Sequence, residues 1–134
     1  MAYEIRDFPK KEWPKKLVEI PDAPKSLRIT GKIPKENIFY LCVVGSRKYS
    51  NYGKEVCNSL ISGLKGYPFS IVSGLALGID SIAHESALKA GLHTVAIPGS
   101  GLGDKVLYPR SHLQLAKRIL DSGGALISEF DDNF

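Results

Sequence analysis

The sequence contains little cysteine: only Cys42 and Cys57 occur among its 134 residues, and they form no CxxC pair. Two cysteines cannot build a disulfide framework, and without CxxC spacing the common zinc and dithiol motifs are excluded. We therefore expect two buried free thiols in a reducing compartment. No apolar run approaches the roughly 20 residues of a membrane span, and the amino terminus lacks the apolar core of a secretory signal. These absences predict a cytoplasmic protein with no membrane segment.

An excess of charge of one sign is also missing. The chain has 18 basic and 14 acidic residues, a net charge of +4. Residues 1–36 hold nine basic and six acidic side chains, and residues 37–134 hold nine and eight. The bulk charge of the larger part therefore does not make it a nucleic-acid binder. An anion site there depends on where individual basic residues and backbone amides lie.

Proline is scarce after residue 36, because five of the eight prolines lie before it. Five prolines in so short a segment disfavour long helices and favour extended or turn structure. We expect residues 1–36 to form an amino-terminal arm, with a short strand at 27–31. Residues 37–134 are expected to form the main domain.

Strands and helices alternate in the predicted main domain. Apolar runs predict strands at 38–45, 69–74, 93–99 and 125–130, the first of them buried on both faces. Helical patterns lie between them, and in the first helix the apolar stripe Val56, Leu60 and Leu64 is expected to face the core. Asp80 or Ser81 is expected to cap the second helix. This alternation predicts an α/β fold, a Rossmann-like three-layer α/β/α arrangement with a mainly parallel sheet.

Three conspicuous loops follow the first three strands, at 43–53, 72–80 and 98–110. The carboxyl ends of parallel strands form the ligand crevice in such folds. Each loop offers glycine, small hydroxyl residues and the start of a helix, a combination suited to phosphate. Glycine also serves simply to make tight turns, but basic residues in two of the loops favour an anion site: Arg47, Lys48, Lys105 and Arg110.

Motifs for catalysis and for cofactors are absent. No GxGxxG follows the first strand, which disfavours a dinucleotide, and no GxxxxGK[ST] exists for a P-loop. The three histidines lack metal-ligand spacing, and no serine lies in GxSxG or has an evident His–acid pair. His84 is expected to be a structural histidine that bonds a nearby loop, and Glu129 either positions a basic side chain or takes part in catalysis. We predict no catalytic residue, no metal and no cofactor.

Longer motifs resemble one known family. The segments WPKKLVEIPDAPKSLRITG (13–31), VVGSRKYSNYG (43–53), VSGLALGIDSIAH (72–84), TVAIPGSGLGDKVLYPR (94–110) and ISEF (127–130), in this order, resemble the DNA-processing protein A (DprA/Smf) family. The resemblance implies a protein that is not an enzyme. It implies cooperative binding of single-stranded DNA and loading of the RecA recombinase during natural transformation. A homodimer is a further expectation.

The resemblance also implies where the strand binds. Arg47 matches the arginine of the family's GSR motif and is expected to contact the DNA backbone. The expected single-strand or phosphate contacts are Gly45, Ser46, Arg47, Lys48, Ser73, Gly74, Ser100, Gly101, Lys105 and Arg110. Three tyrosines in or beside the same loops are expected either to stack on bases or to pack at the rim of the sheet: Tyr49, Tyr52 and Tyr108.

Several alternatives stay open, among them a sensor module that binds a free nucleotide second messenger and a pure scaffold. A nucleotide-binding or nucleotide-cleaving enzyme of the phosphoribohydrolase-like Rossmann group would carry PGGxGTxxE. Pro98 and Gly99 begin that string, but residues 100–102 break it and no glutamate follows. Arg47 is alternatively a structural residue that pairs with Glu129 and holds two strand ends together.

Overall fold

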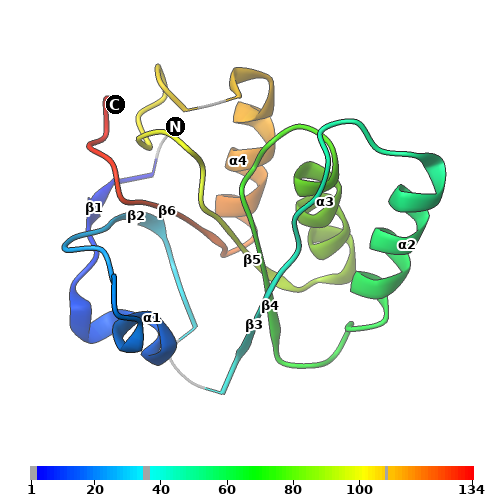
Figure 1. Cartoon of the computed structure of the whole chain (residues 1–134), viewed down its shortest axis with the longest axis horizontal. Helices are drawn as coiled ribbons and strands as arrows, with labels where there is room; N and C mark the ends of the chain where they lie inside the picture. Colours follow the sequence, from blue (N-terminus) through cyan, green and yellow to red (C-terminus); the bar gives the residue numbers. More distant parts are fainter. Residues whose placement is uncertain (1–2, 35–36, 108) are drawn as a thin grey trace.

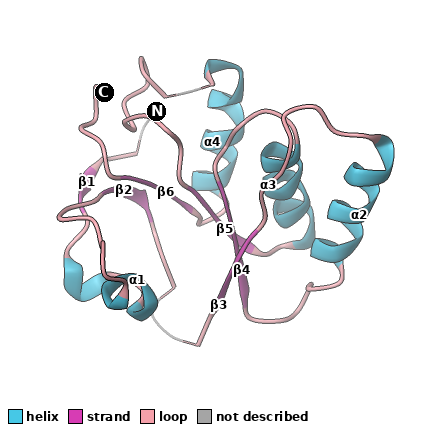
Figure 2. Cartoon of the chain, in the orientation of Figure 1, coloured by secondary structure: helices cyan, strands magenta, loops and turns pink. Residues whose placement is uncertain are grey.

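The computed structural model describes residues 3–34, 37–107 and 109–134. Six strands form one sheet, and helices lie against it (Figures 1 and 2). In chain order the elements are β1 (Arg6–Asp7), the 3-10 turn η1 (Lys10–Glu12), α1 (Lys15–Glu19), β2 (Arg28–Gly31), β3 (Phe39–Cys42), α2 (Asn51–Ser62), β4 (Phe69–Ser73), α3 (Ile79–Ala90), β5 (His93–Ala96), η2 (Arg110–His112), α4 (Leu113–Asp121) and β6 (Ala125–Ser128).

The sheet has the strand order β1-β2-β6-β5-β4-β3. Strands β3 to β6 are parallel, whereas β2 runs antiparallel to β6 and β1 antiparallel to β2. Successive parallel strands are neighbours, so right-handed crossovers bring α2, α3 and α4 to the same face of the sheet. The predicted Rossmann-like fold with a mainly parallel sheet is confirmed.

Both faces of the sheet are covered by apolar side chains. On the helical face, Leu126 and Ala96 pack against Ile119 and Leu120 of α4. On the other face, Val95 and Ile127 pack in one cluster with side chains from the amino-terminal segment: Phe8, Trp13, Leu27 and Ile29. The segment 1–36 thus supplies two strands and part of the core of the same sheet. The division of the chain at residue 36 stays a prediction.

The prediction for the buried side of α2 is wrong for Val56 and Leu60, whereas Leu64, just past the helix, is partly buried against the core. Leu60 is 67% exposed and Val56 37% exposed, whereas Cys57 and Ile61 are buried. These two buried residues pack in a cluster with Ile82 of α3. The helix therefore turns a neighbouring stripe inward, because its main partner is α3 rather than the sheet alone.

The prediction that strand β3 is buried on both faces is also wrong. Phe39, Leu41 and Cys42 are exposed. The reason is strand order: β3 is the outermost strand of the described sheet, next to β4. The expected pair of buried thiols is therefore correct for Cys57 alone, where burial raises the pKa of the thiol.

Candidate nucleic-acid interface

The three predicted loops lie along one edge of the sheet. They follow β3, β4 and β5, which run parallel, so their carboxyl ends meet there. Figure 1 shows these loops along its upper edge, together with the start of α4. We call this region the loop edge, made of residues 43–50, 74–78 and 97–110 without residue 108.

The first loop, residues 43–50, is fixed by backbone contacts and exposes its basic side chains. Gly45 N donates to Asp80 Oδ1 at 3.4 Å, and the carbonyl oxygen of Ser46 accepts from Ile79 N at 3.1 Å. The hydroxyl of Ser46 accepts from Lys48 N at 3.1 Å. Arg47 and Lys48 are exposed, and neither forms an ion pair with a residue that the structure describes.

The second loop, residues 74–78, packs directly on the first. Gly74 N donates to Asp80 Oδ2 at 3.0 Å. Gly78 has φ of 87°, and a Cβ there would overlap the carbonyl oxygen of Ser46, so only glycine fits this close approach. The hydroxyl of Ser73 donates to the carbonyl oxygen of Val43 at 2.6 Å. This serine therefore joins β3 to β4 and is buried.

The position of Asp80 corrects the expected helix cap. Helix α3 begins at Ile79 with Gly78 as its N-cap, and no side chain caps it. Asp80 lies inside the first turn, and its carboxylate accepts from the two loops rather than from its own helix. Sequence reasoning missed this role; the available signal was a carboxylate two residues after Gly78, in the turn that enters the helix.

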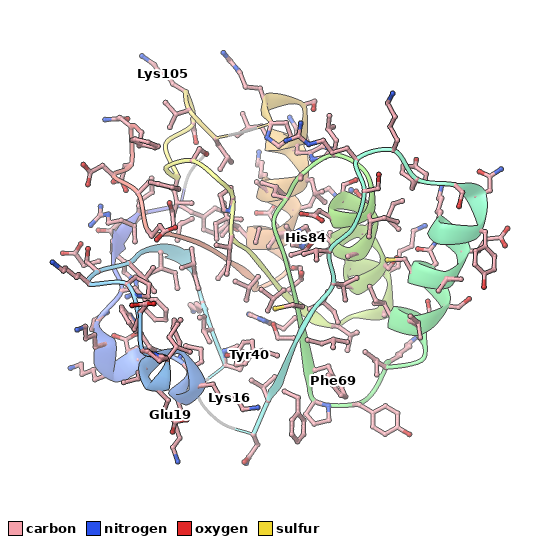
Figure 3. All side chains as sticks on the ribbon, in the orientation of Figure 1. Lys16, Glu19, Tyr40, Phe69, His84 and Lys105 are labelled. Carbon is pink, nitrogen blue, oxygen red and sulfur yellow. The ribbon has the colours of Figure 1, made fainter. Side chains whose placement is uncertain are left out.

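The third loop, residues 97–107, is partly covered by the segment after β6. Ser100 and Gly101 are buried, and a Cβ on Gly101 would overlap the carbonyl oxygen of Asp131. Gly103 N donates to the carbonyl oxygen of Asp132 at 2.8 Å. Beyond this covered part, Lys105 is exposed and extends away from the loop (Figure 3).

Arg110 follows the third loop in η2 and is also exposed. Within the described chain, neither Arg110 nor Lys105 forms an ion pair. Together with Arg47 and Lys48 they give the loop edge four cationic side chains that the described residues leave without an ion pair. Such an arrangement is suited to the phosphates of a polyanion.

The alternative role for Arg47, an ion pair with Glu129, is not what the structure shows. Glu129 is exposed at the end of β6, and the ion pairs of the described residues do not include it. The carboxylate that does hold an arginine near this strand is Asp132, which accepts from Arg28 Nε at 2.9 Å and from Nη2 at 2.8 Å. These bonds hold the pKa of Asp132 below its usual value.

The three tyrosines in or beside the loop edge differ in their surroundings. Tyr49 is 46% exposed in the first loop, and Tyr52 is 76% exposed in the first turn of α2. Tyr108 lies outside the described residues. An exposed phenol ring beside cationic groups has the chemistry for stacking on a nucleobase.

The histidines do not assemble a reactive site. His84 is fully buried beneath the loops (Figure 3), and its Nδ1 lies 2.8 Å from Thr94 Oγ1 on β5. Burial lowers its pKa to about 4, and the charge of His112 contributes in the same direction. The structural interpretation of His84 is correct, although its partner belongs to a strand rather than a loop. Among the described residues, no three His, Cys, Asp or Glu side chains form a group that could hold a metal.

The loop edge and the fold around it have relatives among known proteins. The family model for DNA recombination-mediator protein A matches residues 4–133. Protein Smf from Escherichia coli (strain K12) is 39% identical over 118 residues, which are 88% of this chain and 31% of that protein. The DNA processing protein DprA of Streptococcus pneumoniae (strain R6) is 41% identical over 103 residues, 77% of this chain and 36% of that protein.

Two solved structures share the fold. The X-ray structure of DprA from S. pneumoniae has a TM-score of 0.77 at 33% identity, covering 96% of this chain and 44% of that one. A structure of DNA processing protein A from Helicobacter pylori, solved to describe its single-stranded DNA binding mode, has a TM-score of 0.82 at 27% identity. It covers 99% of this chain and 59% of the other. The chain thus spans about a third of the length of the curated relatives it matches.

Proposed function

The chain belongs to the DNA recombination-mediator protein A family, and on this premise we propose that it binds single-stranded DNA along the loop edge. The observation that carries the proposal is the pair Arg47 and Lys48, exposed and without ion pairs in the described chain, on a loop whose backbone is fixed at Gly45 and Ser46. Cations of this kind on a fixed backbone bind phosphate without first breaking an internal salt bridge.

The phosphate contacts are proposed to come from side chains more than from backbone amides. Arg47 offers a planar fork that fits two phosphate oxygens, and Lys48, Lys105 and Arg110 add point or forked charges along the same edge. The amides of Gly45 and Gly74 already donate to Asp80. We infer that these glycines shape the loops. Three other residues of the expected set are buried and are inferred to have the same role: Ser73, Ser100 and Gly101.

Stacking is proposed to supply the contact with the bases. Tyr49 and Tyr52 expose their rings near the cationic loop, and every nucleobase offers a face to an aromatic ring. Binding of this kind tolerates any sequence and requires unstacked bases. A single strand therefore binds better than a duplex.

The relatives support this function and also limit what is proposed for this chain. The H. pylori relative was solved to describe its single-stranded DNA binding mode. Because this chain spans about a third of its relatives' length, we propose strand binding for this chain and leave RecA loading and dimer formation to the whole family protein. A nucleotide-cleaving reaction is not favoured, since residues 100–102 break the PGGxGTxxE string and the carboxylate of Asp80 already accepts from two loop amides.

Fluorescence anisotropy tests the proposal. Labelled oligo-dT, a mixed-sequence single strand and a duplex of equal length are titrated with the wild-type chain. Both single strands are expected to bind with similar affinity and more tightly than the duplex; equal or tighter duplex binding contradicts the proposal. Lys89→Ala is the matched control, because Lys89 lies near the far end of α3, away from the loop edge. Release of free base from nucleoside monophosphates would instead indicate an enzyme.

A further inference from the structure

We propose that Asp80 is a positioning residue for strand binding: its carboxylate ties together the loops after β3 and β4 and so presents Arg47 to the DNA, without touching the DNA itself. This inference rests on the proposed function. It assigns part of the affinity of an exposed arginine to a buried carboxylate on another element.

The carboxylate divides its two oxygens between the two loops. Oδ1 accepts from Gly45 N at 3.4 Å, and Oδ2 accepts from Gly74 N at 3.0 Å. Asp80 is 7% exposed and lies in the first turn of α3, where the helix dipole favours a negative charge. Each oxygen thus holds one loop, and the helix holds the carboxylate.

The two residues before Asp80 contact the first loop as far as Arg47. The adjacent residue, Ile79, donates its amide hydrogen to the carbonyl oxygen of Ser46 at 3.1 Å. Gly78 packs so closely that a Cβ there would lie 2.6 Å from the Cα of Arg47. Gly78, Ile79 and Asp80 therefore contact three successive residues of the first loop, and only the Asp80 side chain among them also accepts from Gly74 N of the second loop.

The carboxylate also decides where a phosphate can lie. Backbone amides that converge in loops normally attract an anion, but here the amides of Gly45 and Gly74 already donate to the Asp80 carboxylate. With those amides occupied, a DNA phosphate binds the exposed guanidinium of Arg47 instead. A loop held in its binding conformation also loses less entropy when the strand binds.

Asp80→Asn tests this role with almost no change in shape. One acceptor oxygen becomes an NH2 group that faces a loop amide, so one of the two loops is released. We expect single-strand affinity to fall about 15-fold, near the lower end of the range for a hydrogen bond to a charged group. Hydrogen exchange is expected to accelerate at the amide that loses its acceptor, Gly45 N or Gly74 N. The control is Asp121→Asn, which removes an exposed carboxylate at the end of α4 and is expected to leave affinity unchanged.

A double-mutant cycle with Arg47→Ala separates positioning from general support of the fold. If Asp80 acts through Arg47, Asp80→Asn weakens binding much less in the Arg47→Ala background than in the wild type. Wild-type affinity in Asp80→Asn, or fully additive losses in the cycle, overturns the inference. If Asp80→Asn does not fold, Gly74→Ala takes its place, because its Cβ would lie 2.7 Å from Asp80 Oδ2 and displace the carboxylate; the same non-additivity is then required.

The failure of this inference differs from a failure of the proposed function. A wild-type chain that does not bind single strands, or an Arg47→Ala variant that binds like the wild type, overturns the proposed function and this role with it. Weaker binding by Arg47→Ala together with unchanged binding by Asp80→Asn overturns only the role of Asp80.

Discussion

The Nδ1 atom of His84 lies 2.8 Å from Thr94 Oγ1, and the Thr94 hydroxyl donates to the carbonyl oxygen of Ile71 at 2.7 Å. A hydroxyl has one hydrogen, so Thr94 accepts from His84, and Nδ1 carries the imidazole proton. Nε2 is then a bare acceptor, buried and without a partner in the described chain. Protonation would add a buried N–H with no acceptor, which agrees with a pKa of about 4.

The first prediction is that acid destabilises the fold through His84. In the unfolded chain His84 binds a proton below its ordinary pKa of 6.5, whereas in the folded chain it binds that proton only below a pKa of about 4. Stability is therefore full above pH 6.5 and falls as pH drops through this window, by up to about 3 kcal/mol. Urea unfolding at several pH values measures the loss. His84→Gln is expected to flatten the dependence, with the rest arising from His93, whose pKa burial also lowers. An NMR titration of His84 near pH 6.5 would contradict the account.

The second prediction concerns the amino-terminal segment. Trp13 is buried against Phe8, and its Nε1 donates to the carbonyl oxygen of Phe8 at 2.7 Å. Trp13→Ala is expected to lower the free energy of unfolding by about 3 kcal/mol, because it leaves a cavity and an unpaired carbonyl. Trp13→Phe keeps most of the ring and is expected to be less destabilising. If residues 1–36 were an independent arm, the main unfolding transition in urea would stay where it is.

The third prediction concerns stacking. Tyr52 is largely exposed, so Tyr52→Ala removes little internal packing and is expected to leave the melting temperature unchanged. Loss of the ring on which one base stacks is expected to weaken single-strand binding by about 1–3 kcal/mol. Tyr67→Ala is the matched control, since Tyr67 is also exposed but precedes β4 and so lies at the opposite end of that strand. Equal effects of the two substitutions in an anisotropy titration would remove Tyr52 from the proposed site.

The sequence predicts the parallel part of the fold well because local pattern determines it. Alternating apolar runs and helical periods place β3 to β6 near their observed bounds, and Gly91 ends α3 in the left-handed conformation, with φ of 70°. The same periods do not reveal strand order. They assign Leu41 and Leu60 to the core, because a one-dimensional pattern does not distinguish an edge strand from a central one.

The candidate site is predictable in its charges but not in its internal contacts. Arg47 and Lys48 follow the first parallel strand, so their place at the loop edge follows from chain order. The bonds of Asp80 to Gly45 and Gly74 join residues 35 and six positions apart. Bonds of this kind depend on how two loops pack in space, and local spacing along the chain does not encode that packing.

Arg47 provides the most direct test of the central claim, that the loop edge binds the phosphates of single-stranded DNA. Arg47→Ala is expected to weaken binding by about 1.5–3 kcal/mol, and Arg47→Lys to recover part of the affinity, because an ammonium group lacks the guanidinium fork. The deciding measurement is the slope of log K against log salt concentration for wild type and Arg47→Ala on the same single strand. Its magnitude is expected to fall by roughly 0.7 for each phosphate that the variant no longer neutralises, with an unchanged melting temperature. An unchanged slope together with a lower melting temperature would show that Arg47 supports the fold and does not bind the strand.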